Sequence, residues 1–366
     1  MKIKNLLSSY FSKNLLNSLL YCTLISSSFI FLIDAIELSR RISKSNDSNI
    51  FLALKLATLK LPGMIFEILP FVVLFASLSS FFILAKRSEL VVARASGISI
   101  WRLLAPGVSL IIVIGFFIIL ILQPLIATST YKFKENEARF LRGQPSLVTL
   151  SENGLWLKDS NLKNNSYRII NSLGLEKQAS NLEKVIFFNH AAGGKLISRY
   201  DAKSASLIKN FWELNNVWVY EFNKKPEYKA RITIKTNLTP NQIQENFAPP
   251  ETISLWNLPK FIKIAEQAGF NASRHKTKFH SILAFPFFLS SMLIIAAPFS
   301  VRFIRSEKTN SLILSGLLCG LFLYTFANVV SAFGSSGSIS PLLSAWSPPI
   351  IAILLGVSAL IYIEEG

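Results

Sequence analysis

The sequence predicts an α-helical membrane protein with six transmembrane helices and one inserted, β-rich soluble domain. Three observations lead to this fold class. The chain of 366 residues is 51% hydrophobic with a mean hydropathy of +0.42, which is more apolar than ordinary soluble domains. Its apolar residues form three blocks, then a polar stretch follows, and then three more blocks. Within the polar stretch, apolar and polar residues alternate with a period of two, which is typical of β-strands.

Each apolar block is long enough to cross about 30 Å of hydrocarbon, for which a helix needs about 20 residues. The predicted spans are Leu15–Ile36, Leu61–Ala85, Trp101–Ile126, Phe279–Ile304, Leu312–Phe333 and Trp346–Ile363. The second could begin earlier, near Ile50, because the preceding stretch is apolar apart from Lys55 and Lys60. The first block is too long for a cleavable signal peptide and lacks a small-residue cleavage site, so we expect it to be retained as a helix.

The chain therefore divides into three predicted parts: residues 1–126 with the first three spans, the β-rich domain 127–276, and residues 277–366 with the last three spans. Strands of the middle part are predicted at Ser146–Leu150, Gly154–Lys158, Tyr167–Ile170, Lys184–Phe188, Lys195–Ser198, Phe211–Leu214, Val217–Phe222 and Tyr228–Ile234. Many short strands without helices between them indicate a sandwich, a jelly roll or a similar open β structure.

One helix is predicted after these strands. Leu258, Phe261, Ile262, Ala265 and Ala268 share a helical face, and Gly269 follows as an end signal. Because this helix leads directly into the fourth span, we expect it to seat the β domain on the membrane.

The net charge of +17 is not concentrated in a nucleic-acid-binding pattern. Residues 127–276 contain 22 Lys/Arg and 13 Asp/Glu, a net charge of +9, but the charges are scattered. A solvated surface is the first interpretation, and attraction to an anionic amphiphile or membrane surface is the second; no nucleic acid is expected. With the N-terminus inside, ten Lys/Arg flank the spans on the inner side and five on the outer side. This asymmetry predicts cytoplasmic termini and an external β domain.

No motif in the sequence indicates catalysis, a cofactor or a metal. The phosphate loop Gly-x-x-x-x-Gly-Lys-Ser/Thr and the zinc motif His-Glu-x-x-His are both absent. His190, His275 and His280 have no cysteine or carboxylate partners at ligand spacing. Cys22 and Cys319 both fall within predicted spans, which excludes a disulfide framework in the β domain. We therefore expect a chain without enzymatic activity, cofactor or metal site.

The loop between the second and third spans predicts a short cytoplasmic helix near residues 87–97. Ser88 can cap its start and Gly97 can end it. A helix this short cannot bury its apolar residues alone, so it needs a membrane surface or a partner protein. It is either a connector on the membrane surface or a coupling helix for a cytoplasmic ATPase. For the second role the candidate residues are Arg87, Ser88, Glu89, Leu90, Val91, Arg94 and Gly97.

The same loop, Arg-Ser-Glu-Leu-Val-Val-Ala-Arg-Ala-Ser-Gly at residues 87–97, resembles the coupling-helix signature of the LptF/LptG (YjgP/YjgQ) permease family. So do Gly-Leu-Trp-Leu-Lys-Asp at residues 154–159, Lys-Thr-Asn-Leu-Thr-Pro at residues 235–240, and the order of spans across the whole chain. These forms are similar to the LptG branch of the family. The resemblance implies an inner-membrane location, a periplasmic β-jelly-roll domain, and ATP hydrolysis in a separate subunit.

The resemblance also implies partners and a cargo. These are an LptF-like permease as heterodimer partner, a cytoplasmic LptB-like ATPase dimer, an LptC-like accessory subunit and a periplasmic LptA-like bridge. Lipopolysaccharide would be extracted from the inner membrane and passed to that bridge. The alternative is a membrane-anchored scaffold or receptor whose β domain binds periplasmic partners without transport, but a scaffold gives no reason for an internal docking helix.

Candidate lipopolysaccharide-binding residues lie at the outer end of the first span: Phe31, Asp34, Arg40, Arg41 and Lys44. Arginine suits a phosphate because its planar fork can donate to two oxygens at once. The alternative is that these cations bind ordinary anionic head groups, or Asp34 and Glu37. In the family a lysine can occur three residues before the position of Asp34, where this chain has Phe31, so we expect the main contact at Arg40 and Arg41.

By the same resemblance, the first and fifth spans form lateral gates against the partner. Ser315, Gly316 and Gly320 lie on one side of the fifth span, where small residues allow close approach of helices. They indicate either a gate or ordinary helix packing. Glu67, inside the second span, is either paired with Lys60 or faces a cavity.

Overall fold

The computed structural model describes residues 2–43, 50–140, 148–151, 154–161, 166–176, 181–191, 195–208, 211–221, 224–236, 249–267, 271–302 and 309–365. The chain forms two compact units. The helical unit contains Met1–Phe133 and Ser273–Gly366, and the β unit contains Lys134–Ala272. The boundaries of both units lie in helical segments, at the end of the third span and the start of the fourth.

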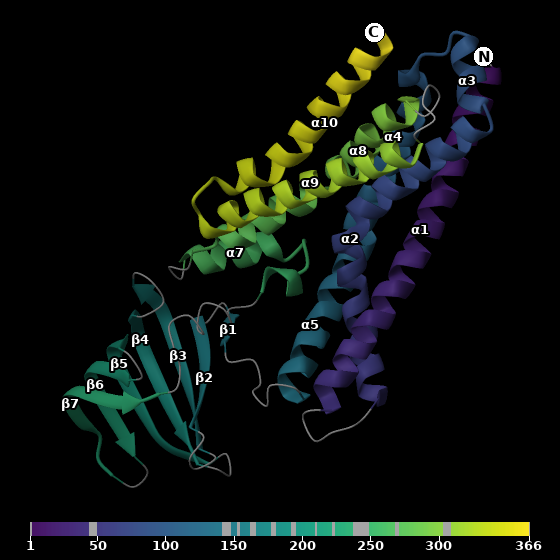
Figure 1. Ribbon diagram of the computed structural model, residues 1–366. Coiled ribbons are helices and arrows are strands. Elements are labelled where there is room, and N and C mark those ends of the chain that lie inside the picture. The colour runs from purple at the N-terminus through teal and green to yellow at the C-terminus, as the bar shows by residue number, and fades with distance from the viewer. Residues whose placement is uncertain are drawn as a thin grey trace. The chain divides into compact units, whose positions relative to one another are not determined.

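The described helices of the helical unit include six that are long and apolar enough to cross a membrane, as predicted. They are α1 (Lys2–Ser43), α2 (Ile50–Lys86), α4 (Ile100–Phe117) continued by α5 (Gln123–Phe140), α8 (Ser273–Arg302), α9 (Thr309–Ser336) and α10 (Pro341–Glu365). A π-helical turn at Ile118–Leu122 joins α4 to α5 without a break. The short helix α3 (Glu89–Ala95) lies between α2 and α4, at the same end of this unit as the N- and C-termini (Figure 1).

The spans differ greatly in how much of their surface other helices cover. Within the most apolar window of each, α8 is 78% buried and α2 is 61% buried, so these two form the centre of the unit. By contrast, the corresponding windows of α1 and α9 are 11% and 17% buried. The first and fifth spans therefore offer the largest apolar surfaces for lipid or for another membrane protein.

The β unit contains one antiparallel sheet whose strands follow each other in chain order (Figure 1). The strands are β1 (Val148–Ser151), β2 (Gly154–Asn161), β3 (Ser166–Glu176), β4 (Asn181–His190), β5 (Leu196–Ile208), β6 (Phe211–Glu221) and β7 (Glu227–Lys235). The inserted β domain is thus confirmed. Among the open β structures that the sequence allowed, it is a curved meander rather than a Greek-key jelly roll, because short connections place each strand beside its neighbour in the chain.

The prediction of eight strands was wrong at one place. The two segments predicted at Phe211–Leu214 and Val217–Phe222 fall in one strand, β6, which runs through Asn215 and Asn216 to Glu221; Phe222 lies outside the described residues. Asn216 adopts a φ of +53°, and the pairing with β5 steps from Asn215–Ser204 to Val217–Ala202 around it. Asparagine tolerates this left-handed conformation better than most residues, so the pair disturbs the ladder without ending the strand.

The core of the β unit lies on one face of the sheet. Its largest fully buried side chains, Trp212 and Phe187, meet edge to face with ring centroids 5.9 Å apart. The helix α7 (Leu258–Gln267) forms as predicted, and its Ala265 belongs to the same buried cluster, with Phe261 and Ile262 packed against it. The predicted apolar face of α7 therefore serves the core of the β unit.

Candidate functional site

The helix α3 is set off from its neighbours by two residues in left-handed conformation. Ser88, with a φ of +58°, turns the chain sharply after α2, and its carbonyl accepts the first hydrogen bond of α3 from the amide of Val92. At the other end Gly97 has a φ of +75°, and the amide of Ile98 donates to the carbonyl of Ala93. This is a Schellman motif, which glycine favours because it has no Cβ. The end signals predicted at Ser88 and Gly97 are thus where the helix begins and ends.

One face of α3 is buried and the other is open. Leu90 and Ala93 are buried, whereas Val91 is 40% exposed and Val92 is 65% exposed. The sequence predicted that a helix this short could not bury all its apolar residues, and the structure shows which remain uncovered. Arg94 lies in α3, but its side chain is outside the described residues.

A polar cluster fixes α3 to the start of α1. The hydroxyl of Tyr10 donates to Oε1 of Glu89 over 3.1 Å, and Nη1 of Arg87 donates to the same hydroxyl over 3.3 Å. Arg87 also lies 4.0 Å from Oε1 of Glu89, as an exposed and therefore weak ion pair. The other oxygen, Oε2 of Glu89, is enclosed but has no hydrogen-bond partner among the described residues. Tyr10 is a residue that sequence reasoning missed, because no local pattern links it to a residue 79 positions away.

Aromatic packing holds the same end of α1 against α2 and α4. The buried rings of Phe11 and Phe81 lie 5.3 Å apart, and a Cβ at Gly107 would come within 2.7 Å of the Phe11 ring. Glycine at position 107 therefore makes room for this ring. The hydrogen bonds of Tyr10 thus tie α3 to the part of α1 that packs against α2 and α4.

The opposite end of α1 carries the predicted lipid-binding residues, and the structure pairs several of them within the chain. Asp34, 4% exposed, forms an ion pair with Lys60 of α2, whose ammonium group also lies 5.8 Å from the centre of the Phe133 ring. Glu37 forms an ion pair with Arg41 one helical turn away. The Glu37–Arg41 pair is one that the sequence left open as an alternative, whereas Asp34 takes Lys60 as its partner instead of one of the candidate cations.

The remaining candidates at this end differ in accessibility. Arg40 is exposed and forms no ion pair with any described residue, and Phe31 is half-buried. Lys44 lies outside the described residues. Of the predicted cations Arg40, Arg41 and Lys44, Arg40 is therefore the one whose guanidinium is available to a ligand, as far as the described residues show.

The small residues of α9 pack inside this chain. A Cβ at Gly316 would lie 3.3 Å from Leu78 of α2 and from Phe299 of α8, and a Cβ at Gly320 would lie 2.1 Å from Leu74 of α2. The hydroxyl of Ser315 donates to the carbonyl of Leu312 in its own helix. The two glycines thus allow α9 to pack closely on α2 and α8. The exposed apolar side chains of α9 are Leu314, Leu318, Leu321, Phe322, Val329 and Phe333.

Comparison with known proteins identifies the family. Residues 9–362 match the family model described as "Lipopolysaccharide export system permease LptF/LptG". The chain belongs to this family. It is 22% identical over 300 residues to the lipopolysaccharide export system permease protein LptG of Escherichia coli K12, covering 79% of each chain. It is also 22% identical to LptG of Haemophilus influenzae over 361 residues, covering 96% of this chain and 97% of the relative.

The family match extends over both units of this permease, the six spans and the inserted sheet alike. It therefore supports the family resemblance from the coupling loop, the two β-domain motifs and the order of spans. The residues Asn237–Pro240 of the third motif lie outside the described residues.

Glu67 of this permease lies in α2 and is exposed. The sequence offered Lys60 as its partner, but the structure pairs Lys60 with Asp34 instead. Among the described residues no ion pair to Glu67 is found. A carboxylate within a membrane span is costly to leave without a partner or water, and such residues usually serve function.

Proposed function

We propose that this chain is the non-catalytic transmembrane subunit of an ATP-driven transporter that extracts lipopolysaccharide from the inner membrane and passes it to a periplasmic bridge. The chain has both termini and α3 in the cytoplasm and the β unit in the periplasm. Two observations support this orientation in the membrane. The short inner loops have an excess of Lys/Arg, and α3 and both termini lie at one end of the helical unit (Figure 1).

The observation that carries the proposal is the exposed, rigidly held helix α3. Val91 and Val92 are open at one end of the helical unit, and the side chain of Glu89 in the same helix is 36% exposed. An apolar patch next to an accessible carboxylate fits a protein surface that offers apolar and cationic side chains. Since the sequence has no phosphate loop, an ATPase subunit bound there would supply the energy.

The contacts of α3 suggest how movement reaches the membrane. Tyr10 ties Glu89 to α1, and Phe11 locks the same part of α1 between α2 and α4. Beyond this corner, α1 has one of the least buried surfaces of the six spans. A displacement of α3 on nucleotide binding would therefore tilt α1 against whatever covers its exposed face.

We assign that face to a lateral gate. The exposed side chains Tyr21, Leu24, Ile25, Phe29, Leu32, Ile33 and Ile36 form an apolar stripe along α1. With the exposed side of α9, it would meet an LptF-like permease and enclose the acyl chains of the cargo. Arg40, at the periplasmic end of the stripe, would bind a phosphate of lipid A, because a guanidinium binds phosphate oxygens with charge-assisted hydrogen bonds.

The full assembly in this proposal contains an LptF-like permease, an LptB-like ATPase dimer and an LptC-like accessory subunit. An LptA-like bridge would receive the cargo in the periplasm. The β unit would form the first part of the periplasmic path, with its curved sheet offering one concave face to the lipid.

Co-purification with the ATPase subunit tests this function. Glu89→Lys should reduce the amount of ATPase that copurifies with the membrane-inserted chain, since it places a cation where the partner is expected to offer one. Glu364→Lys is the matched control, because it makes the same charge change on α10 at the same end of the helical unit and should leave the yield unchanged.

Equal ATPase yield from Glu89→Lys and the control would remove the main support for transport. A wild-type chain that binds periplasmic partners but never an ATPase would instead favour the scaffold alternative. The phosphate contact has its own test. Arg40→Glu should lower photo-crosslinking of lipopolysaccharide to α1, and an unchanged yield would reduce Arg40 to a topological anchor.

A further inference from the structure

The helix α7 has one face in the core of the β unit and a second face that is open. Phe261 and Ala265 belong to the core side. On the other side Trp256, in the turn that leads into α7, is 60% exposed, and Lys260 and Lys263 are exposed as well. These three residues follow each other at intervals of four and three positions, so they lie on one side of the helix. We call them the outer face of α7.

Backbone hydrogen bonds show that Trp256 is part of this helical arrangement. The amide of Leu258 donates to the carbonyl of Ser254 over 3.0 Å, and the amide of Phe261 donates to the carbonyl of Asn257 over 3.0 Å. Both bonds join residues four positions apart, as in an α-helix. The helical spacing therefore extends back through Trp256, and Leu258 on the core side is fully buried.

The chain limits how far α7 can lie from the fourth span. Ala272, the last residue of the β unit, is buried in the same cluster as Ala265 of α7. The helix α8 begins at the next residue, Ser273, and its predicted apolar span starts at Phe279. Six helical residues rise about 9 Å. The core that holds α7 is therefore joined to the edge of the hydrocarbon by at most about 9 Å of helix.

The chain before α7 is tied to the end of the third span in a similar way. Glu251, in the short 3₁₀-helix η2 (Pro250–Thr252), forms an ion pair with Lys134 of α5 over 3.5 Å. The helix α5 continues the third span, whose predicted apolar block ends at Ile126. Lys134 follows eight residues later, which is about 12 Å along the helix. Both sides of α7 are thus held near the level of the lipid head groups, which extend about 5–8 Å beyond the hydrocarbon.

The residue types of the outer face suit a surface of lipid head groups. Tryptophan is enriched at membrane–water interfaces because its ring is apolar and its indole N–H needs a hydrogen-bond acceptor. Lysine can lay its hydrocarbon stem along the apolar boundary while its ammonium group stays among the polar heads. From Ser254 to Lys278 the chain contains five Lys/Arg and one Glu, a net charge of +4. This charge favours an anionic lipid surface.

We propose that the outer face of α7 rests on the membrane surface and binds the phosphate groups of its lipids. The ring of Trp256 would lie at the level of the head groups, and Lys260 and Lys263 would each bind a lipid phosphate. The β unit then has a third attachment to the membrane besides α5 and α8, which prevents it from swinging about the line that joins these two helices. This goes beyond the proposed function, because it requires neither transport nor a cargo.

Tryptophan quenching in lipid nanodiscs tests the contact. The full-length chain is placed in anionic phospholipid with or without bromine atoms on the upper part of the acyl chains, which quench nearby indole rings. The emission of Trp256 is obtained as the difference between the wild-type chain and Trp256→Phe. We expect bromine to lower this difference about twofold, because an interfacial helix lies within about 5–10 Å of the boundary with the acyl chains.

Trp218→Phe is the matched control for position. Trp218 is also exposed, but it alternates with the buried Val217 and Val219 and so lies on the side of the sheet opposite the core. Its emission, obtained in the same way, should not change with bromine. If Trp256 is not quenched by bromine, the proposal is overturned. Protection of Trp256 from the aqueous quencher acrylamide without any bromine effect would show that a protein surface covers it instead.

The phosphate contact has a separate test. Lys260→Glu/Lys263→Glu should remove most of the bromine effect on Trp256, since carboxylates repel anionic head groups. Lys195→Glu/Lys203→Glu makes the same change in charge at two exposed lysines beside and within β5 and should leave the effect intact. If the first double variant does not fold, Lys263→Glu replaces it. Equal quenching in the folded α7 variant and in its control overturns the assignment of the lysines to lipid phosphates. Failure of ATP-driven export would leave all of these results unchanged.

Discussion

Gly320→Ala distinguishes packing inside the chain from a role at the partner interface. The added methyl group would lie 2.1 Å from Cδ2 of Leu74, a side chain with no exposed surface. Forcing extra atoms into a packed interior costs about 1–3 kcal/mol. Alanine offsets about 1 kcal/mol of this through its higher helix propensity. The net expected loss of stability is therefore about 0–2 kcal/mol.

Gly316→Ala is the internal control. Its methyl group would lie 3.3 Å from Leu78 and Phe299, a distance that small shifts of a few tenths of an ångström relieve. We expect its stability to equal or exceed that of the wild-type chain. Both substitutions add the same atoms to the same helix, so they differ only in what lies opposite.

The assay is thermal unfolding of the purified chain in detergent, with Gly320→Ala, Leu74→Ala and the double variant compared as a mutant cycle. Removing Leu74 should make Gly320→Ala harmless, which appears as a favourable interaction energy in the cycle. The reasoning is refuted if Gly320→Ala unfolds at the wild-type temperature but prevents association with the second permease subunit. That result would instead support a role of Gly316 and Gly320 at the lateral gate against the second permease subunit.

Three further substitutions test other contacts. Tyr10→Phe keeps the ring but removes the hydrogen bond to Glu89, so the folded chain should lose about 1 kcal/mol of stability. The substitution should lower nucleotide-stimulated transport more than it lowers ATPase co-purification. Equal losses of both would contradict a role of Tyr10 in transmitting movement. Lys60→Met should lower the free energy of unfolding by about 3–5 kcal/mol, because Asp34 stays buried without its partner. The double variant Asp34→Leu/Lys60→Met should restore most of that stability. If thermal unfolding shows no such restoration, the two residues are not coupled. Glu67→Gln should leave unfolding unchanged and reduce lipopolysaccharide crosslinking to α2, whereas lowered stability with normal crosslinking would mark a structural role.

The features predicted well from the sequence are those set by local pattern. Six apolar blocks determine six spans because a bilayer requires a fixed helix length. The C-terminal end of α3 follows from Gly97, because glycine adopts a positive φ at little cost in free energy. The period of two places the strands, although an Asn-Asn pair looks like a turn in the sequence and is a local distortion of β6 in the structure.

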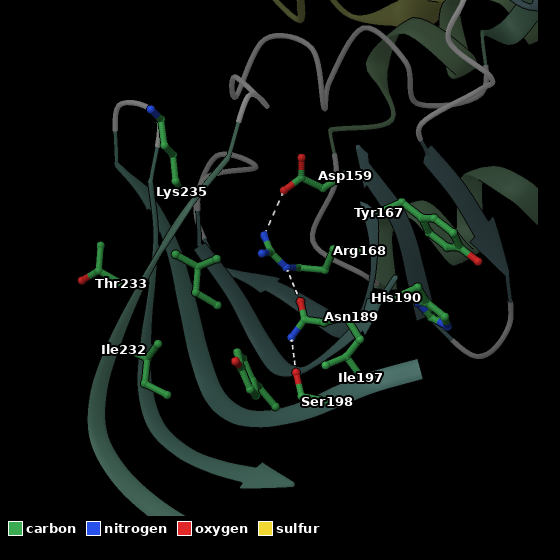
Figure 2. Close-up of a pocket in the computed structure, with 12 residues that line it drawn as sticks. Asp159, Tyr167, Arg168, Asn189, His190, Ile197, Ser198, Ile232, Thr233 and Lys235 are labelled. Atoms are coloured by element: carbon green, nitrogen blue, oxygen red, sulfur yellow. Dashed lines mark hydrogen bonds and ion pairs between the residues drawn. The ribbon is translucent and has the colours of Figure 1, made fainter. Parts of the chain in front are cut away.

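Contacts between distant residues could not be predicted in the same way. Tyr10 reaches Glu89, and Lys60 pairs with Asp34 rather than with Glu67, because helix packing decides which faces meet. The alignment of polar side chains across β2, β3, β4 and β5 could not be predicted from the sequence either. The four residues lie on four strands, and only the pairing register brings Asp159, Arg168, Asn189 and Ser198 into line (Figure 2).

Delivery of lipopolysaccharide from proteoliposomes to a soluble periplasmic acceptor tests the central claim most directly. The vesicles would hold this chain with an LptF-like permease, an LptC-like subunit and an LptB-like ATPase, and delivery would be followed by crosslinking over time with and without ATP. We predict ATP-dependent delivery that Glu89→Lys abolishes and Glu364→Lys leaves intact. Delivery that is absent in the wild-type assembly, or equal with and without ATP, would contradict the account.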